Sequence, residues 1–171
     1  SCGFKPALTA STAESIGINV TVNPLPLATH SAASSTTFCQ GSSVILNANT
    51  GAGLTHQWQK NNTDISGATD ANYTATETGN YKVIITNTDN CSNSSGITTV
   101  TVNSLPGANI TTVGDTTFCN GNSVQLLVGT GSGYSYQWKK DALTITGANL
   151  SSYIATTSGN YSVVVTDGNN C

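Results

Sequence analysis

The chain has 171 residues, of which only 8% are charged, and its five basic side chains leave a formal net charge of −3. This sparse basic content excludes the concentrated positive face that nucleic-acid binding needs. No apolar run approaches the ~20 residues that cross a bilayer, so we expect no membrane insertion.

Threonine, serine, asparagine and glycine dominate the sequence. Most of the apolar residues are β-branched and fall in short runs, separated by glycine, asparagine, aspartate and serine. This composition is typical of an all-β protein with many turns. No segment has the 3.6-residue period of an amphipathic helix, so we expect essentially no helix.

Alternation of apolar and polar residues predicts a series of half-buried strands along the chain. In the middle of the sequence the predicted strands cover residues 43–47, 55–59, 71–75, 81–86 and 97–102. Short clusters of Gly, Asn, Asp and Ser lie between them and supply the turns.

An internal repeat governs the organisation of the chain. Shifted by 80 positions, the sequence overlays itself without a gap, and almost half of the positions between Cys39 and Cys91 are identical. The matching pairs include Cys39/Cys119, Trp58/Trp138, Tyr81/Tyr161 and Cys91/Cys171. A period of 80 is too long for solenoid repeats and suits one small β-sandwich per unit.

Two features of the repeat resemble an immunoglobulin-like sandwich. A single tryptophan, Trp58 or Trp138, stands in the middle of the third strand, where the core tryptophan of that fold lies. Residues 78–83 resemble the tyrosine corner, in which Tyr81 (Tyr161 in the next unit) bonds back to the backbone. The residue two further on, often cysteine in immunoglobulin domains, is Val83 here, so the usual buried disulfide is absent.

These features predict tandem immunoglobulin-like β-sandwich modules. Residues 1–23 form the tail, with the last strand, of a preceding repeat. Residues 24–103 form a complete repeat, and residues 104–171 form a repeat without a counterpart of the strand at 97–102. The linkers read Asn-x-Leu-Pro, and their prolines limit bending.

The full motif string is more particular. It reads Cys-x-Gly-x-Ser-Val-x-Leu, Gln-Trp, Ile-x-Gly-Ala, Tyr-x-Ala-Thr, Gly-Asn-Tyr-x-Val and Asn-Cys. Over residues 20–171 it is similar to the Ig-like and PKD-like repeats of very large secreted Bacteroidetes proteins. That resemblance implies export, often by type IX secretion, and roles as adhesins, gliding-motility proteins or spacers in polysaccharide-degrading enzymes. Residues 1–18 do not match the pattern.

Five cysteines in a chain with so little charge favour an oxidising compartment. There is no CxxC pair and neither histidine lies near a cysteine, so structural disulfides are favoured over a zinc site. The recurring spacing allows the pairs Cys39–Cys91 and Cys119–Cys171 within each repeat.

The direction of the strands in an immunoglobulin sandwich argues against pairing within a repeat. The turn after Cys39 and the hairpin holding Cys91 lie at opposite ends, roughly 20 Å or more apart, whereas a disulfide needs Cα atoms within ~7 Å. We therefore favour an inter-module bridge, Cys39–Cys171, and keep the pairing within repeats as the alternative. Cys91 would bond to a preceding module and Cys119 to a following one, and the partner of Cys2 stays open.

For the other candidate sites, a structural role is a better interpretation than a functional one. Trp58 and Trp138 could stack on sugars, but the fold makes both core residues. The acidic residues lack the spacing of a calcium loop, and no Ser-His-Asp set recurs between the repeats, so we expect no metal, no cofactor and no enzyme. The sequence Asp115-Thr116-Thr117 resembles a Bacteroidetes O-glycosylation acceptor, with Thr116 as the acceptor residue.

The sequence therefore predicts a structural or adhesive stalk segment of a large exported cell-surface protein, used in adhesion or gliding motility. Its partners would be neighbouring repeats of the same polypeptide, and surface glycans or other cell-surface proteins. One alternative is a spacer or accessory carbohydrate-binding module of a secreted glycoside hydrolase. Another is the subunit of an extracellular filament that assembles by strand exchange.

Overall fold

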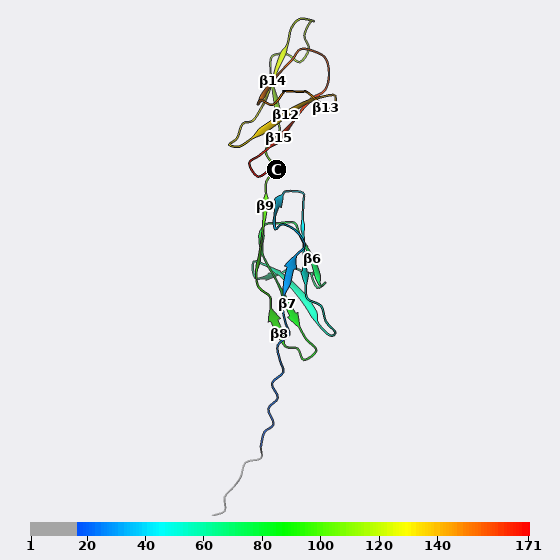
Figure 1. The fold of residues 1–171 in the computed structure, drawn as a ribbon, viewed down its shortest axis with the longest axis vertical. Coiled ribbons are helices and arrows are strands. Elements are labelled where there is room, and N and C mark those ends of the chain that lie inside the picture. The colour runs from blue at the N-terminus through cyan, green and yellow to red at the C-terminus, as the bar shows by residue number, and fades with distance from the viewer. Residues whose placement is uncertain (1–16) are drawn as a thin grey trace, which may run out of the picture.

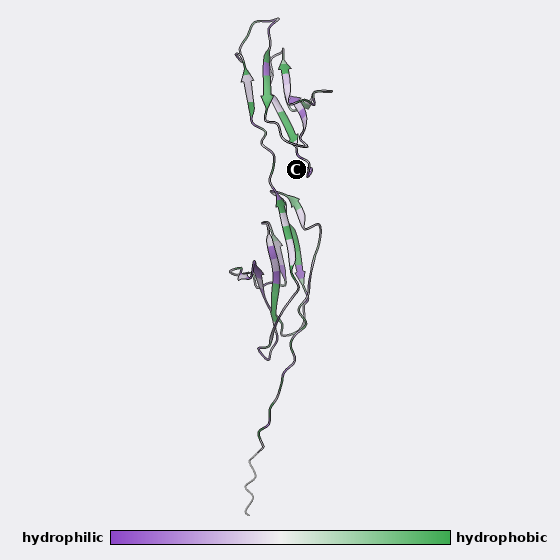
Figure 2. Ribbon diagram, turned by 90° about the vertical axis from the view of Figure 1, so that its left-hand side faces the viewer, coloured by the Kyte–Doolittle hydropathy of each residue, from purple (hydrophilic) through white to green (hydrophobic). Residues whose placement is uncertain are grey.

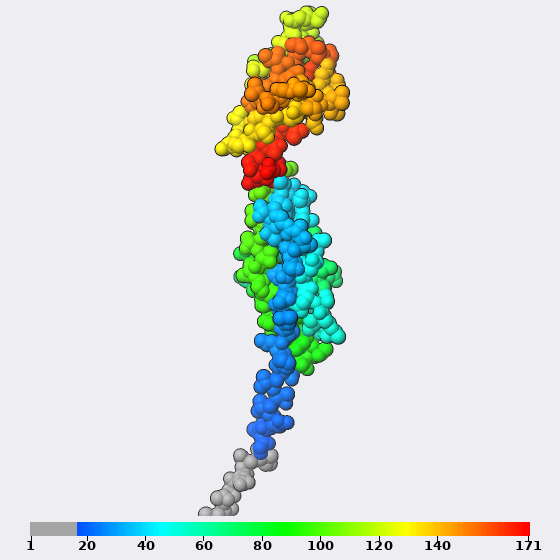
Figure 3. Space-filling view, in the orientation of Figure 1, coloured from blue at the N-terminus to red at the C-terminus, as the bar shows by residue number. Residues whose placement is uncertain are grey.

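The computed structural model describes residues 17–171, and Cys2 lies outside this range. Its strands form two groups that follow one another along an elongated molecule (Figure 1, Figure 3). We call residues 24–103 module 1 and residues 104–171 module 2. Every regular element in the described part of the chain is a strand, which confirms the predicted all-β class.

Module 1 is a two-layer sandwich. One sheet has the order β1-β3-β6, made of β1 (His30–Ala32), β3 (Val44–Ala48) and β6 (Asn72–Ala75). The other has the order β2-β9-β7-β4-β5, made of β2 (Thr37–Cys39), β9 (Thr98–Asn103), β7 (Gly79–Thr86), β4 (Thr55–Lys60) and β5 (Thr63–Asp64). The short strand β8 (Ser92–Ser94) pairs with the end of β7. This is the strand order of an immunoglobulin-like sandwich.

Module 2 repeats most of this plan. One sheet has the order β10-β11-β14, from β10 (Ile110–Val113), β11 (Val124–Val128) and β14 (Ser152–Ala155). The other has the order β13-β12-β15, from β13 (Leu143–Thr144), β12 (Ser135–Lys140) and β15 (Tyr161–Thr166). Within the described residues no strand lies beside β15 in the position that β9 takes beside β7, as the repeat register predicts.

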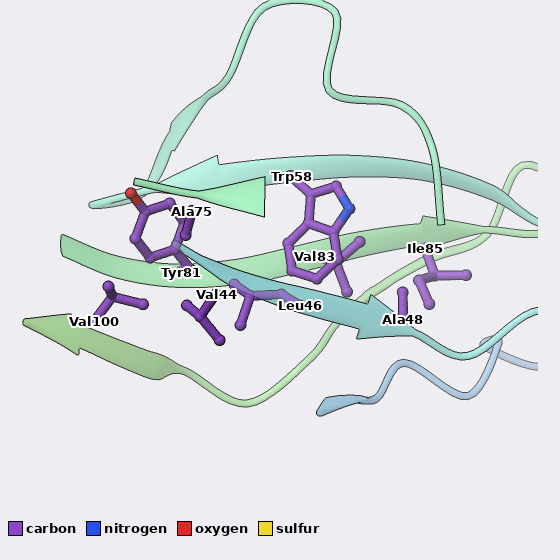
Figure 4. Close-up of a cluster of buried hydrophobic side chains, with 9 residues drawn as sticks. All are labelled: Val44, Leu46, Ala48, Trp58, Ala75, Tyr81, Val83, Ile85 and Val100. Atoms are coloured by element: carbon purple, nitrogen blue, oxygen red, sulfur yellow. The ribbon is translucent and has the colours of Figure 1, made fainter. Parts of the chain in front are cut away.

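The two sheets of each module close over a tryptophan. Trp58 and Trp138 are both 0% exposed, and each indole Nε1–H donates to a backbone carbonyl twelve residues on, Asp70 O at 3.0 Å and Leu150 O at 2.9 Å. Figure 4 shows Trp58 among inward-facing apolar side chains of module 1, and Figure 2 shows hydrophobic residues recurring along the strands of both modules. The predicted core role of both tryptophans is therefore confirmed.

The predicted tyrosine corner is present in both modules. The hydroxyl of Tyr81 donates to Glu77 O at 2.9 Å, and that of Tyr161 donates to Thr157 O at the same distance. Burial raises the pKa of Tyr81, which keeps its hydroxyl protonated as this bond requires. Val83 points inward and is 0% exposed, as predicted for the residue two places after the corner tyrosine.

The same tripeptide, Thr-Phe-Cys, has different structures in the two modules. Residues 37–39 form β2, which pairs only with β9, in parallel. Residues 117–119 form no strand, because no described residue takes the position of β9 beside them. The core of module 2 is correspondingly less covered, since Val124 and Leu126 are each 5% exposed and their counterparts Val44 and Leu46 are at 1% and 0%.

Residues 17–29 form no strand. The predicted final strand of a preceding repeat falls in this segment, where Val20 and Val22 are 77% and 88% exposed. A strand needs a neighbour with which to exchange backbone hydrogen bonds, and residues 18–22 have none among the described residues. Its assignment to a preceding repeat therefore stays a prediction.

We predict that Trp58→Ala lowers the free energy of unfolding of module 1 by about 3–5 kcal/mol, because it leaves a large cavity between the sheets. Tyr81→Phe should cost about 1 kcal/mol through the lost corner hydrogen bond. Urea unfolding followed by circular dichroism measures both. Leu143→Ala, at a side chain that is 75% exposed, is the control and should change stability little. Wild-type unfolding of Trp58→Ala together with lost glycan attachment would contradict the core role.

Candidate functional site at the module junction

The described residues contain one disulfide, and it joins the two modules. Cys39 at the end of β2 is bonded to Cys171, 132 positions later, with Cα atoms 5.4 Å apart. Cys171 lies between the modules, next to the end of module 1 from which the chain leaves (Figure 1). The favoured pairing Cys39–Cys171 is therefore confirmed, and the alternative with Cys39–Cys91 and Cys119–Cys171 is wrong.

A structured turn presents Cys171 to its partner. Asp167 N–H donates to Cys171 O at 2.9 Å, and the Asp167 carboxylate accepts from the backbone N–H groups of Cys171 and Asn169, each at 2.9 Å. Asn170 takes the left-handed conformation that closes this turn, with φ 60°. The bond from Cys171 N–H is the main cause that lowers the pKa of Asp167, so the carboxylate stays charged and holds the turn at neutral pH.

Cys39 is fixed on the other side by the strand that leads out of module 1. Cys39 is opposite Asn103, the last residue of β9, and Gln40 N–H donates to Asn103 O at 2.8 Å. Cys39 O accepts from Ser42 N–H at 3.0 Å, which closes a turn around Gly41. The disulfide is therefore anchored beside the point at which the linker to module 2 begins.

The other two described cysteines have no disulfide partner. Cys119 is exposed and Cys91 is partly buried. They are the counterparts, 80 positions away, of Cys39 and Cys171. The prediction that they bond to neighbouring modules is not tested within this chain.

The remaining predicted side chains lie apart from the junction. Thr116 is exposed. Its glycosylation is not tested by the structure and stays a prediction. His56 is half-buried beside Trp58 on β4, with its Nε2 3.0 Å from Asn49 O. Among residues 17–171 no three His, Cys, Asp or Glu side chains gather as metal ligands would. No helix in the described part is long and apolar enough to cross a membrane.

A polar cluster inside module 1 was not predicted from the sequence. His30 Nδ1 lies 2.9 Å from Ser95 Oγ, and His30 Nε2 lies 2.8 Å from Thr98 Oγ1. The His30 ring meets Trp58 edge-on, with ring centroids 5.4 Å apart. Ser95 Oγ also accepts from Val83 N–H at 3.0 Å, so it supplies the acceptor where β8 and β9 separate.

The sequence signal for this cluster was faint. The counterpart of His30 in module 2 is Ile110, so the repeat pattern marks position 30 as one that faces the core. A histidine at such a position needs hydrogen-bonding partners from another strand, and the one-dimensional pattern does not show which ones. Burial lowers the pKa of His30, which favours its neutral form.

Neither any family model nor any curated protein matches the sequence. The chain is similar in structure to the fibronectin(III)-like modules of Clostridium thermocellum CbhA, at 14% identity and a TM-score of 0.38, over 82% of this chain and 87% of that one. For murine CEACAM1b the identity is 16% and the TM-score 0.37, over 83% and 93%. For Bacteroides ovatus SGBP-B, in complex with a mixed-linkage heptasaccharide, they are 15% and 0.34, over 79% and 39%.

The strand order, the core tryptophan and the tyrosine corner define the chain as tandem immunoglobulin-like β-sandwich modules. The disulfide between the modules is typical of proteins that work outside the reducing cytosol.

We predict that module 1 loses stability as the pH falls from 7.5 to 5.5. The pKa of His30 is lower in the folded state than the ordinary value of about 6.5, so the unfolded chain binds more protons in this range and unfolding is favoured. Above about pH 7 the stabilising contribution of neutral His30 is fully present. Urea midpoints measured across this range should show a smaller pH dependence in His30→Gln. The control Leu143→Ala, at an exposed side chain that carries no ionisable group, should keep the wild-type dependence, and an identical dependence in both variants would contradict the role of His30.

Proposed function

We propose that the chain is a segment of a structural, adhesive stalk on an exported cell-surface protein, and that it serves to carry tensile load in adhesion or gliding motility. The observation that supports this most is the Cys39–Cys171 disulfide. A disulfide within a module would stabilise one domain, whereas this one restrains the joint between two domains.

The covalent path through the chain changes when the disulfide forms. Force applied before Cys39 and at Cys171 passes directly through the sulfur–sulfur bond. The residues between these two cysteines lie in a closed loop with a sequence separation of 132. Both tryptophan cores and nearly all of the strands are in that loop, so tension along the stalk does not extend them.

The joint has two connections instead of one. The peptide linker at residues 104–109 leaves β9 and reaches β10, and the disulfide joins Cys39 to the turn after β15. Two attachments at different points of the junction limit bending and twisting more than a single flexible linker would. Pro106 stiffens the peptide connection further.

The composition suits a stalk outside the cell. Few charges and a surface rich in threonine give a rod whose contacts depend little on salt. Export by type IX secretion, and an origin among the Bacteroidetes repeats that the motif string resembles, belong to the same proposal. The alternative of a sugar-binding module loses its clearest platform, because both tryptophans are 0% exposed.

Pulling single molecules tests the proposal. With handles before residue 17 and after Cys171, we expect the oxidised protein to extend only by the chain outside the disulfide loop. Cys39→Ser opens the loop, so unfolding should release roughly 130 further residues, or about 430–470 Å at full extension.

Cys91→Ser is the matched control, because Cys91 forms no disulfide within residues 17–171. It should extend like the wild type when oxidised, and reduction of either protein should release the long segment. Equal extension of the wild type and Cys39→Ser under oxidising conditions would overturn the load-carrying role of the disulfide.

A further inference from the structure

A hollow of about 410 Å³ lies on module 2, where β10 and β11 approach the linker. Its volume falls within the range of about 300–1,000 Å³ that is usual for small-ligand sites. Thr111 and Leu127 are paired across its floor, while their neighbours Ile110 and Val128 pack in the core, so the hollow opens on the outer face of the sheet. The residues that line it are Gly107, Asn109, Thr111, Leu127, Val128 and Gly129.

Two missing side chains open the hollow. Gly107 and Gly129 stand where module 1 has Leu27 and Asn49. Apart from the adjacent residues, no heavy atom lies within 4 Å of the place that a Cβ would take at either glycine. Leu127, where module 1 has an asparagine, gives the hollow an apolar floor.

Asn49 fills the corresponding place in module 1 and shows what fits there. Its Oδ1 accepts from Thr29 N–H at 2.7 Å and from the Thr29 hydroxyl at 3.1 Å, and its Nδ2–H donates to Leu27 O at 3.1 Å. One carboxamide group therefore satisfies both a donor and an acceptor of the same backbone segment.

This contact selects a primary carboxamide. Leu27 O and Thr29 N–H are separated by a single residue, so both lie on the same side of the planar Asn49 amide. The N–H that points to that side is the one next to the amide oxygen, and a primary carboxamide has it. A trans secondary amide, such as a peptide bond or an N-acetyl group, has a carbon atom in that place.

The same two backbone groups are vacant in module 2. They are Asn109 N–H and Gly107 O, and no hydrogen bond reaches either of them within residues 17–171. The bond from Asn49 N–H to Thr29 O, 3.0 Å long in module 1, also has no counterpart in the described part of module 2. Module 2 thus keeps the donor and the acceptor but lacks the amide that bridges them.

The strands that complete module 1 do not cover this face. Leu27 is 70% exposed although β8 and β9 are both in place, and Ser31, the counterpart of Thr111, is exposed too. All residues around the hollow belong to the linker, β10, β11 and the residue after β11. The hollow is therefore a property of this sheet face and of the two glycines.

We propose that the hollow binds a primary carboxamide, the side chain of an asparagine or glutamine on a partner protein. The carboxamide oxygen accepts from Asn109 N–H, its N–H donates to Gly107 O, and its aliphatic stem lies on Leu127. No charged side chain lines the hollow, so a carboxylate of the same shape would be desolvated without a counter-charge and could not donate to Gly107 O. The inference goes beyond the load-carrying role of Cys39–Cys171 and does not depend on it.

Titration of the isotope-labelled full chain with propanamide, followed by nuclear magnetic resonance, tests the proposal. We expect saturable shifts of the backbone N–H signals of Asn109 and Gly129. N-methylpropanamide is the matched ligand, because it keeps the carbonyl group and replaces the N–H beside it. It should bind about threefold to tenfold more weakly, through the loss of one hydrogen bond, and propanoate should give no saturable shift.

Gly129→Asn places the chain's own carboxamide in the hollow, as Asn49 does in module 1, and should abolish the saturable shifts. Gly96→Asn is the matched control, since a Cβ there also meets no heavy atom within 4 Å and Gly96 lies in module 1. It should bind propanamide like the wild type. The double variant Leu27→Gly, Asn49→Gly copies the hollow into module 1, and should add a second saturable shift at Thr29. Circular dichroism checks that each variant is folded.

Three outcomes would overturn the proposal. One is a wild-type protein whose Asn109 signal does not saturate, or saturates equally with propanamide and N-methylpropanamide. Another is a folded Gly129→Asn variant that still binds propanamide. The third is tighter binding of N-acetylglucosamine than of propanamide, which would make the ligand a glycan instead of a protein side chain. None of these results alters the extension measured for Cys39→Ser, so failure here is distinguishable from failure of the stalk role.

Discussion

The packing of two sheets over one buried tryptophan sets the directions of all the strands in a module. The Trp58 indole donates a hydrogen bond to Asp70 O, just before β6. Its ring contacts Tyr73, and the Tyr73 ring in turn contacts Tyr81 at the start of β7. These contacts tie the two sheets together and fix which turns lie at which end. Cys39 and Cys91 are consequently held at opposite ends of module 1, and neither can reach the other without unfolding the sandwich.

Because Cys39 and Cys91 are held apart, they cannot form a disulfide that stabilises one module. The cysteines are instead available to connect neighbouring modules. In an end-to-end arrangement, the end that holds Cys39 faces the end of the next module that holds Cys171, where their Cα atoms are 5.4 Å apart. The same core geometry therefore stabilises each module and determines which pair of cysteines can bond. A repeat without this internal separation could have closed its disulfide within the module.

The sequence contained enough information for the main strands, the core and the junction. Alternation around Val44, Trp58 and Val83 marked strands whose observed bounds differ by a residue or two, and the repeat with the strand directions identified the disulfide. The two- and three-residue strands β1, β5 and β8 were missed, because alternation cannot be recognised over so few residues. β1 exists through pairing with β3, more than a dozen positions further on, whereas β5 and β8 exist as the short second strands of hairpins with β4 and β7.

His30 and β2 show the same limit for the site. The partners of His30 lie 65 and 68 positions away, so only the folded chain brings the cluster together. The Thr-Phe-Cys tripeptide is a strand in module 1 and not in module 2, although its residues are identical. Its structure depends on whether a strand occupies the neighbouring position, since a backbone edge forms a strand only with a partner.

This dependence links the joint to the completeness of each module. Cys39 reaches Cys171 from the end of β2, and β2 is held there by β9, through the bond between Gln40 N–H and Asn103 O. Cys119 lies at the equivalent position of module 2, and no described strand pairs with residues 117–119. The strand that completes the second sheet of module 1 is therefore also the element that positions Cys39 for its bond to Cys171.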